Sequence, residues 1–317
     1  MKAASIPVDL PNPGQVFACL GFLEAASFLL GDAEGRFDWA DLANVRFGLS
    51  AAGSDNPFGA VLEFLATSEP EQWAPVGYQD PPPKKAKADE PAEDEDEIED
   101  SETKANGLAL SDAFPAGEGD RMSLAIRLGG GSHPLIELGH WADGSSRNNF
   151  KLYAGNRSAY GIARAMLLGV RDKPKRNQTI GELKTRGITQ LWEEQRDALI
   201  ERPFHVLTPM GGSFNFDPRG AWTAIDAGYS PNEHKHRVAA SPVVEFLAAW
   251  GLENARPDEF ETRKVRYAAW GIPLPPILAR AALYGGIATL PMKRFHFDLD
   301  MSGKNKVVTF AEPEIKE

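Results

Sequence analysis

The chain has 317 residues, of which 42% are hydrophobic and 25% are charged, as is normal for a soluble globular protein. Its formal net charge of −11 argues against a protein that coats nucleic acid non-specifically, because a polyanion repels a net negative surface. A single cysteine, Cys19, excludes an internal disulfide. The sequence shows neither a signal pattern nor an apolar run near ~20 residues, so we expect a cytoplasmic protein without membrane contact.

The N-terminal part of an α+β core is expected over residues 1–67. The pattern predicts a strand at 5–10, a helix from Gly14 to about Gly31, a strand within 36–53 and a helix over 56–69. Asn12 and Asn56 are the candidate N-caps, because each precedes a proline at the start of an apolar stripe. This strand–helix–strand–helix order is typical of the beginning of a ferredoxin-like module.

Residues 68–106 contain a proline run followed by a dense run of charge. Within 84–104 there are ten acidic residues and four lysines, for a net charge of −6. Such a stretch has too little apolar surface to offset the entropy of ordering, so we predict a disordered acidic insertion, whose role the sequence leaves open.

Residues 107–317 are predicted to form the remainder of the core, or a second module. The expected strands lie at 108–114, 122–130 and 134–140, the expected helices at 158–170, 179–200 and 242–250, and a closing hairpin at 293–313. Strands and helices are interspersed without a regular βαβ alternation. The predicted fold class is therefore α+β, with mixed or antiparallel sheets, packed helices and room for a ferredoxin-like module of the RAMP or RRM type.

The run WADGSSRNNFKLYAGNRSAY, residues 141–160, is the first candidate for binding. It opens a basic segment, because residues 145–176 carry a net charge of +7. Its cations and amides suit phosphates or base edges, and its aromatic rings suit stacking on unpaired bases. The alternative is a solvated loop whose aromatics are core residues and whose Asn156 or Ser158 caps the next helix.

Three further motifs have a functional and a structural interpretation. The turn Gly211-Gly212-Ser213 offers amides to an anion, or is a simple hairpin turn. His234 and His236 share one face of a strand and suit a metal, or belong to a basic surface loop. His140 and Asp143 suit acid–base chemistry, or are structural polar residues. No established catalytic motif is present in the sequence, so a non-enzymatic protein without cofactor or metal is expected.

Five segments together resemble a known family: IPVDLPNPGQVFACLGFLEAA, HWADGSSRNNFKLYAGNRSA, TPMGGSFNFDPRGAW, AIDAGYSPN and RVAASPVVEFLAAWGLE. They are similar to the large-subunit-type protein of subtype I-G (formerly I-U) CRISPR systems. The resemblance implies a non-catalytic subunit of a Cascade-like ribonucleoprotein in antiviral defence. It implies guide RNA, target DNA, other Cascade subunits and a helicase-nuclease as partners, with a role in flanking-motif recognition and nuclease recruitment.

The chemistry of the side chains, rather than the resemblance, selects the candidate nucleic-acid contacts. They are Arg147, Lys151, Asn156, Arg157, Arg164, Asn215, Lys235 and Arg237. Two alternatives remain open. One is a ferredoxin-like guide-RNA-processing endoribonuclease with His140, His205 or His236 as general acid or base. The other is a small-molecule enzyme that uses the Gly211–Gly212 turn as an anion hole.

Overall fold

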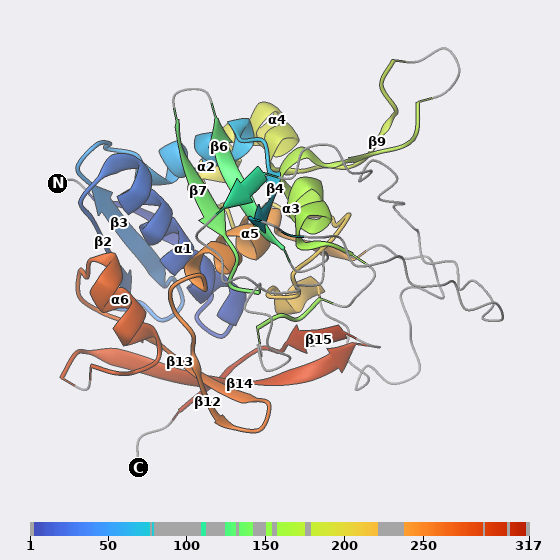
Figure 1. Ribbon diagram of the computed structural model, residues 1–317. Helices are drawn as coiled ribbons and strands as arrows, with labels where there is room; N and C mark the ends of the chain where they lie inside the picture. Colours follow the sequence, from blue (N-terminus) through green and yellow to red (C-terminus); the bar gives the residue numbers. More distant parts are fainter. Residues whose placement is uncertain are drawn as a thin grey trace.

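The computed structural model describes residues 3–76, 78, 109–111, 124–130, 133–141, 150–153, 157–174, 179–220, 238–287, 289–302 and 305–314. Within these ranges, helices pack against several small and mostly antiparallel sheets, as Figure 1 shows. The predicted α+β class is confirmed.

The N-terminal part contains the elements β1 (Ala4–Pro7), α1 (Pro13–Leu30), β2 (Ala33–Asp38), β3 (Arg46–Ala51) and α2 (Pro57–Thr67). Both predicted caps are confirmed, since the Asn12 and Asn56 side chains accept the backbone N–H of Gln15 and Gly59. The region 36–53 holds a turn between two strands, not one strand. The carboxylates of Asp38 and Asp41 accept the backbone N–H groups of Ala40 and Ala43, which bends the chain there.

The first sheet has the order β1-β3-β2, with both pairs antiparallel. This is the order that a split βαβ arrangement produces, so the first five elements match the beginning of a ferredoxin-like module. The strand that would complete the module beside β1 is β4 (Glu71–Pro75), but β4 pairs with β5 (Ala109–Ser111) and β6 (Ala125–Gly130) in another sheet. The described residues therefore contain no complete ferredoxin-like module.

The boundary predicted for the acidic insertion is wrong at its N-terminal side. Residues 71–75 form β4, and the side chains of Trp73 and Ala74 are buried. The Arg127 guanidinium lies over the Trp73 ring, 4.0 Å from its centre, and covers one face of that ring. A tryptophan followed by an alanine can bury enough surface to hold a short strand, and residues 79–108 lie outside the described ranges.

A second sheet of order β5-β4-β6-β7 is completed by β7 (His133–Leu138). Helices α3 (Ala159–Leu168), α4 (Ile188–Glu201) and α5 (Pro242–Gly251) follow, with short strands β10 (Thr208–Pro209) and β11 (Ala239–Ala240) between the last two. The prediction of a helix from residue 179 is wrong. Residues 183–185 form β9 (Leu183–Thr185), which pairs with β8 (Val170–Arg171), and α4 begins only after Gly187.

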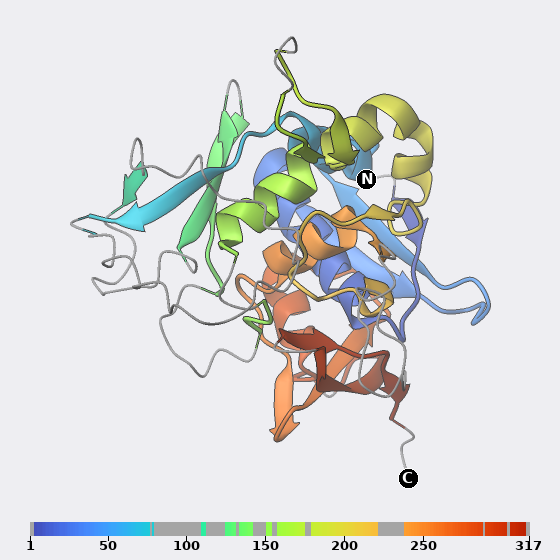
Figure 2. The same ribbon diagram turned by 90° about the vertical axis from the view of Figure 1, so that its right-hand side faces the viewer.

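Helices α1 and α5 form the centre of the molecule, and Figure 2 shows sheets on different sides of them. Helix α1 is long and apolar enough to cross a membrane by length and composition. However, 78% of it is buried in the fold, as in the core helix of a globular protein. Its close contact with α5 depends on Gly21, where a Cβ atom would lie 1.9 Å from the Leu247 carbonyl oxygen.

The C-terminal elements are β12 (Asp258–Glu261), β13 (Lys264–Trp270), α6 (Pro276–Leu283), β14 (Met292–Ser302), β15 (Asn305–Val308) and β16 (Glu312–Pro313). The closing hairpin is confirmed as β14 and β15, which pair in antiparallel register. Buried side chains tie this sheet to the N-terminal part. The Tyr267 hydroxyl donates to the Leu10 carbonyl at 2.6 Å, and the Trp270 indole donates to the Gly35 carbonyl at 2.7 Å. Both halves of the chain contribute to one hydrophobic core.

Candidate functional site

Half of the predicted contact residues lie outside the described ranges, namely Arg147, Asn156, Lys235 and Arg237, as do His234, His236 and Asp143. The four that the structure places are Lys151, Arg157, Arg164 and Asn215.

Arg157 lies immediately before α3, whose N-cap is Ser158. The Ser158 hydroxyl accepts the backbone N–H of Gly161 at 3.0 Å. Of the two predicted cap candidates, Asn156 and Ser158, the cap is therefore Ser158. The exposed Arg157 guanidinium donates from Nη1 to the Gly211 carbonyl at 2.6 Å. The structure thus brings together the two motifs that the sequence singled out, the run around 141–160 and the glycine turn at 211–213.

The glycine turn packs against α3 and Val170. A Cβ atom at Gly212 would lie 3.3 Å from the Ile162 Cα atom, and one at Gly211 would lie 2.3 Å from a Val170 methyl group. Neither glycine lines the groove of about 790 Å³ between β1 and β14. The anion-hole hypothesis needed a pocket lined by this turn, so the described residues do not support it.

The aromatic residues of the 141–160 run belong to the hydrophobic core. Trp141, Phe150 and Tyr153 are all buried, and the Trp141 indole donates to the Leu124 carbonyl at 3.1 Å. The Trp141 ring stacks on Phe214, with centroids 4.9 Å apart and an interplanar angle of 23°. These three rings are unavailable for stacking on bases, so the structural alternative describes them correctly. Tyr160, at half-burial, packs against the same core.

The remaining candidates have mixed surroundings. The half-buried Lys151 places its Nζ 5.4 Å from the centre of the Tyr153 ring, and Arg164 is exposed on α3. Asn215 has a backbone φ of 67°, and its side-chain amide lies 3.5 Å from the Leu152 carbonyl oxygen. Asparagine tolerates this left-handed conformation, so Asn215 shapes the bend between Ser213 and Asp217.

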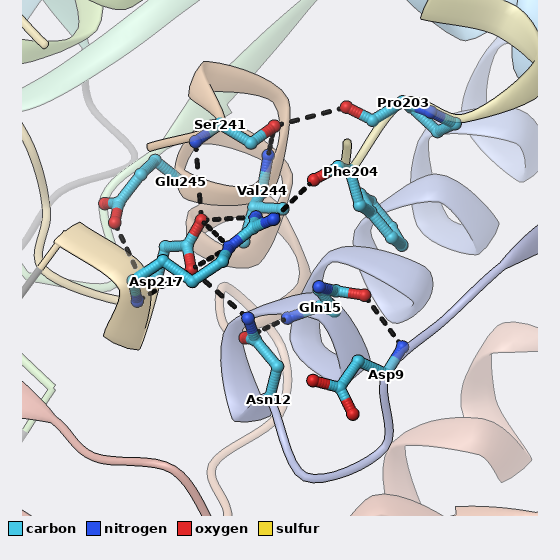
Figure 3. Close-up of polar contacts among 10 residues, drawn as sticks. Asp9, Asn12, Gln15, Pro203, Phe204, Asp217, Ser241, Val244 and Glu245 are labelled. Atoms are coloured by element: carbon cyan, nitrogen blue, oxygen red, sulfur yellow. Dashed lines mark hydrogen bonds and ion pairs between the residues drawn. The ribbon is translucent and has the colours of Figure 1, made fainter. Parts of the chain in front are cut away.

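A buried polar cluster, absent from the sequence predictions, lies beneath this bend (Figure 3). Asp217 is 1% exposed, and its carboxylate accepts the Asn12 side-chain amide at 3.2 Å and the Ser241 backbone N–H at 3.3 Å. The Arg219 guanidinium donates to the same carboxylate at 2.6 Å and to the Phe204 carbonyl at 2.7 Å. Asp217 therefore joins the N-caps of α1 and α5, which are Asn12 and Ser241.

Glu245, on α5, holds the other side of the same bend. Its two carboxylate oxygens accept the backbone N–H groups of Phe214 at 2.8 Å and Asp217 at 2.7 Å. Burial raises the pKa of Glu245 to about 7, and the negative charge of Asp217 acts in the same direction, despite the lowering effect of hydrogen bonds from the Asp217 and Phe216 backbone and from Ser213. The sequence shows Asn12 as an N-cap candidate and Glu245 in the first turn of an apolar helix. It does not show that both residues lie around the same bend.

A groove of about 790 Å³ opens beside this cluster, between β1, β14 and the loop after α4. Asp9, His205, Lys293, Arg294 and Glu314 contribute its ionisable groups. Burial raises the pKa of Asp9. Burial also lowers the pKa of His205, with Arg219 and Arg202 acting in the same direction. The groove thus contains a histidine whose neutral form is favoured near a carboxyl group.

His140 and Cys19 have structural surroundings. His140 is 6% exposed and packs against the Trp141 ring, with centroids 4.6 Å apart. The backbone N–H of His140 donates to the Glu253 carboxylate at 2.8 Å. Cys19 is fully buried in α1, which raises the pKa of its thiol well above the usual value. No metal-binding group of three or more His, Cys, Asp or Glu occurs among the residues that the structure describes.

Comparison of the chain with the models of known protein families, with curated proteins and with solved structures finds no match.

Proposed function

We propose that the chain is a non-catalytic subunit of a CRISPR guide-RNA effector complex, of the kind found in subtype I-G systems. Its role would be to contact target DNA and its flanking motif, and to help recruit the helicase-nuclease. The proposal follows from the five sequence segments that resemble that family, and the position of Arg157 is the structural observation that carries the binding site.

Arg157 has the properties of a phosphate contact. It is exposed, and within the described residues its guanidinium makes one hydrogen bond, to a backbone carbonyl rather than to a carboxylate. A guanidinium has five N–H donors in a planar fork, so most of them remain for a phosphate. The side chain also lies at the N-terminal end of α3, where the helix dipole favours an anion.

Charge reversal at this position tests the proposal. Arg157→Glu should weaken binding to a labelled duplex DNA and lower the slope of log affinity against log salt by about 1, because one phosphate contact and its released counterion are lost. The matched control is Arg36→Glu, an exposed arginine on β2, which should leave binding unchanged. Equal affinity and equal salt slope for wild type and Arg157→Glu would remove this site from the proposal.

Co-purification tests the assembly itself. A subunit of a guide-RNA complex, expressed with its neighbouring genes, should elute with an RNA of uniform length. If the chain elutes alone from such a preparation, the assignment to an effector complex is wrong.

An endoribonuclease is the second candidate, and the groove is the observation that favours it. Among the three histidines that the sequence offered, His205 lines this groove with Asp9, and its lowered pKa suits a general base at neutral pH. Metal-free incubation with CRISPR repeat RNA should then give defined cleavage that His205→Ala abolishes. His140→Ala serves as the comparison, because His140 is buried away from the groove. Intact RNA with wild-type protein excludes this candidate.

A further inference from the structure

The groove between β1 and β14 has the size of a site for a small organic ligand. Its volume of about 790 Å³ falls within the range of roughly 300–1,000 Å³ that is usual for such sites. One wall is the start of β14, residues 292–295, and the other contains the loop after β1 and the bend at 42–45. Leu42, which is 71% exposed, and Met292 give the groove an apolar part that a ligand can cover.

The β14 wall carries two positive charges, on Lys293 and Arg294. The Lys293 Nζ atom lies 5.8 Å from the centre of the Trp39 ring. The Arg294 guanidinium lies beside the turn after α6, since a Cβ atom at Gly285 would be 3.5 Å from its Nε atom. Both cations are half-buried, and within the described residues neither is ion-paired with a carboxylate. This wall therefore favours an anion.

The two acidic residues of the groove differ in their partners. The Glu314 carboxylate accepts the Arg266 guanidinium, so its charge is compensated. The Asp9 backbone N–H donates to the Gln15 side-chain oxygen at 2.8 Å, which fixes the position of Asp9 (Figure 3). The Asp9 carboxylate itself has no hydrogen-bond partner among the described residues. It is thus available to accept an N–H or O–H group of a ligand.

His205 belongs to the same end of the groove as Asp9, because the charges of the two groups influence one another. Partial burial and the charge of Arg219 lower the pKa of His205, so the neutral ring with one donor and one acceptor nitrogen is favoured. The Arg219 guanidinium is itself bonded to Asp217 at 2.6 Å. This end of the groove therefore offers hydrogen bonds, whereas the β14 wall offers positive charge.

The free edge of β1 is unsuited to an added peptide strand. A peptide that extends a sheet needs free main-chain donors and acceptors along that edge. Pro7 has no N–H, and the Asp9 N–H is already bonded to Gln15. The Ser5 carbonyl accepts the Arg46 guanidinium at 2.7 Å. The groove therefore favours a small ligand, held by side chains, over a polypeptide.

We propose that this groove binds a nucleoside phosphate, with the phosphate at Lys293 and Arg294 and the base edge at Asp9. A nucleotide combines the features that complement the lining, namely an anionic group, a planar ring and N–H donors on the ring edge. Adenine and cytosine have an exocyclic amino group for the Asp9 carboxylate, whereas uracil has a carbonyl oxygen at that position. The inference goes beyond the proposed function and does not rest on it, because Arg157 is not part of the groove.

The test is isothermal titration calorimetry of the full chain with AMP, CMP, UMP, cytidine and inorganic phosphate. AMP and CMP should bind about tenfold more tightly than UMP, which lacks the amino group for Asp9. Cytidine and inorganic phosphate should each bind at least about tenfold more weakly than CMP, because each makes only part of the contacts. A short RNA that begins with cytidine, with and without a 5′-phosphate, shows whether the nucleotide is free or a strand end. Tighter binding of the phosphorylated RNA than of CMP assigns the strand end, and equal or weaker binding assigns the free nucleotide.

Two variants assign the contacts. Lys293→Ala should weaken CMP binding by about tenfold and leave cytidine binding unchanged, because it removes a phosphate contact. Asp9→Asn should reduce the preference for CMP over UMP. The matched control is Lys306→Ala, a half-buried lysine on β15 outside the groove, which should leave CMP affinity unchanged. Far-UV circular dichroism and the melting temperature confirm the fold, and Lys293→Met, which keeps the apolar stem, replaces Lys293→Ala if that variant unfolds.

The opposite results overturn the inference. They are wild-type protein that binds none of the nucleotides, equal affinity for CMP and inorganic phosphate, or an equal loss in Lys293→Ala and Lys306→Ala. The outcome is separate from that of the proposed function. CMP binding without any DNA binding would leave the groove and remove the DNA contact, whereas DNA binding that depends on Arg157, without CMP binding, would do the reverse.

Discussion

At the scale of single residues, the most informative group is the Glu245 carboxylate, which holds the bend at 213–217 from inside the core. Burial raises its pKa from an ordinary 4.5 to about 7. The folded state therefore binds the proton more tightly than the unfolded state does. Protonation of Glu245 therefore stabilises the folded state. This contribution is fully present below about pH 4.5 and is lost as the pH rises to about 7. The full shift corresponds to about 3 kcal/mol of unfolding free energy.

Glu245→Gln tests this at the same position. Glutamine has the shape of the protonated acid and does not titrate, so the unfolding free energy of the variant should depend less on pH between about 4.5 and 7 than that of wild type. Urea unfolding at several pH values measures the difference. Because the pKa values of Glu253 and Asp9 are also raised, the variant is compared with wild type at each pH, which cancels their contribution. Parallel pH curves for the two proteins would contradict the assignment.

At the scale of elements, the contact between α1 and α5 determines the centre of the fold. Two glycines allow the helices to touch through their backbones. A Cβ atom at Gly21 would lie 1.9 Å from the Leu247 carbonyl oxygen, and one at Gly251 would lie 2.3 Å from the Phe17 carbonyl oxygen. Backbone atoms cannot move aside as a flexible side chain can, so an added methyl group must separate the helices.

Gly21→Ala should therefore lower the unfolding free energy by about 3 kcal/mol, even though alanine has the higher helix propensity. The control is Gly48→Ala in β3, where the nearest atoms would be 3.8 Å away in ordinary contact. Chemical unfolding of both variants gives the comparison. A neutral or stabilising Gly21→Ala would show that the two helices are not in this close contact.

At the scale of the whole molecule, the N- and C-terminal parts are expected to unfold together, because their side chains share one core and one set of buried hydrogen bonds. Tyr267→Phe removes the donor to the Leu10 carbonyl and should cost about 1–3 kcal/mol, since that carbonyl stays buried without a partner. Tyr284→Phe, at an exposed tyrosine, should cost little. The measurement is thermal unfolding followed by tryptophan fluorescence and by circular dichroism.

Coincident transitions for wild type, and for Tyr267→Phe at a lower temperature, are the expected result. Two separate transitions would show that the C-terminal sheet is an independent module, which the sequence left open.

Local patterns predicted much of the fold. Asn12 and Asn56 cap the helices at which the sequence placed them, and α3, α5 and the final hairpin lie close to their predicted ranges. The failures occur where a local pattern competes with a tertiary contact. Residues 179–187 have a helical stripe but contain strand β9, which pairs with β8, and Trp73 is buried in a strand beside a charge-rich run. Apolar spacing alone cannot distinguish these cases.

By itself, the sequence determined the α+β class, the helix caps and the segregation of charge along the chain, because each depends on neighbouring residues or on a whole pattern. The tertiary structure decided that Trp141 and Tyr153 are core residues, that Arg157 contacts the Gly211 turn, and that Asp217 and Glu245 meet around one bend. Those contacts join residues that are distant in the chain. They depend on which surfaces exclude water from one another, and that is settled only when the helices and sheets pack.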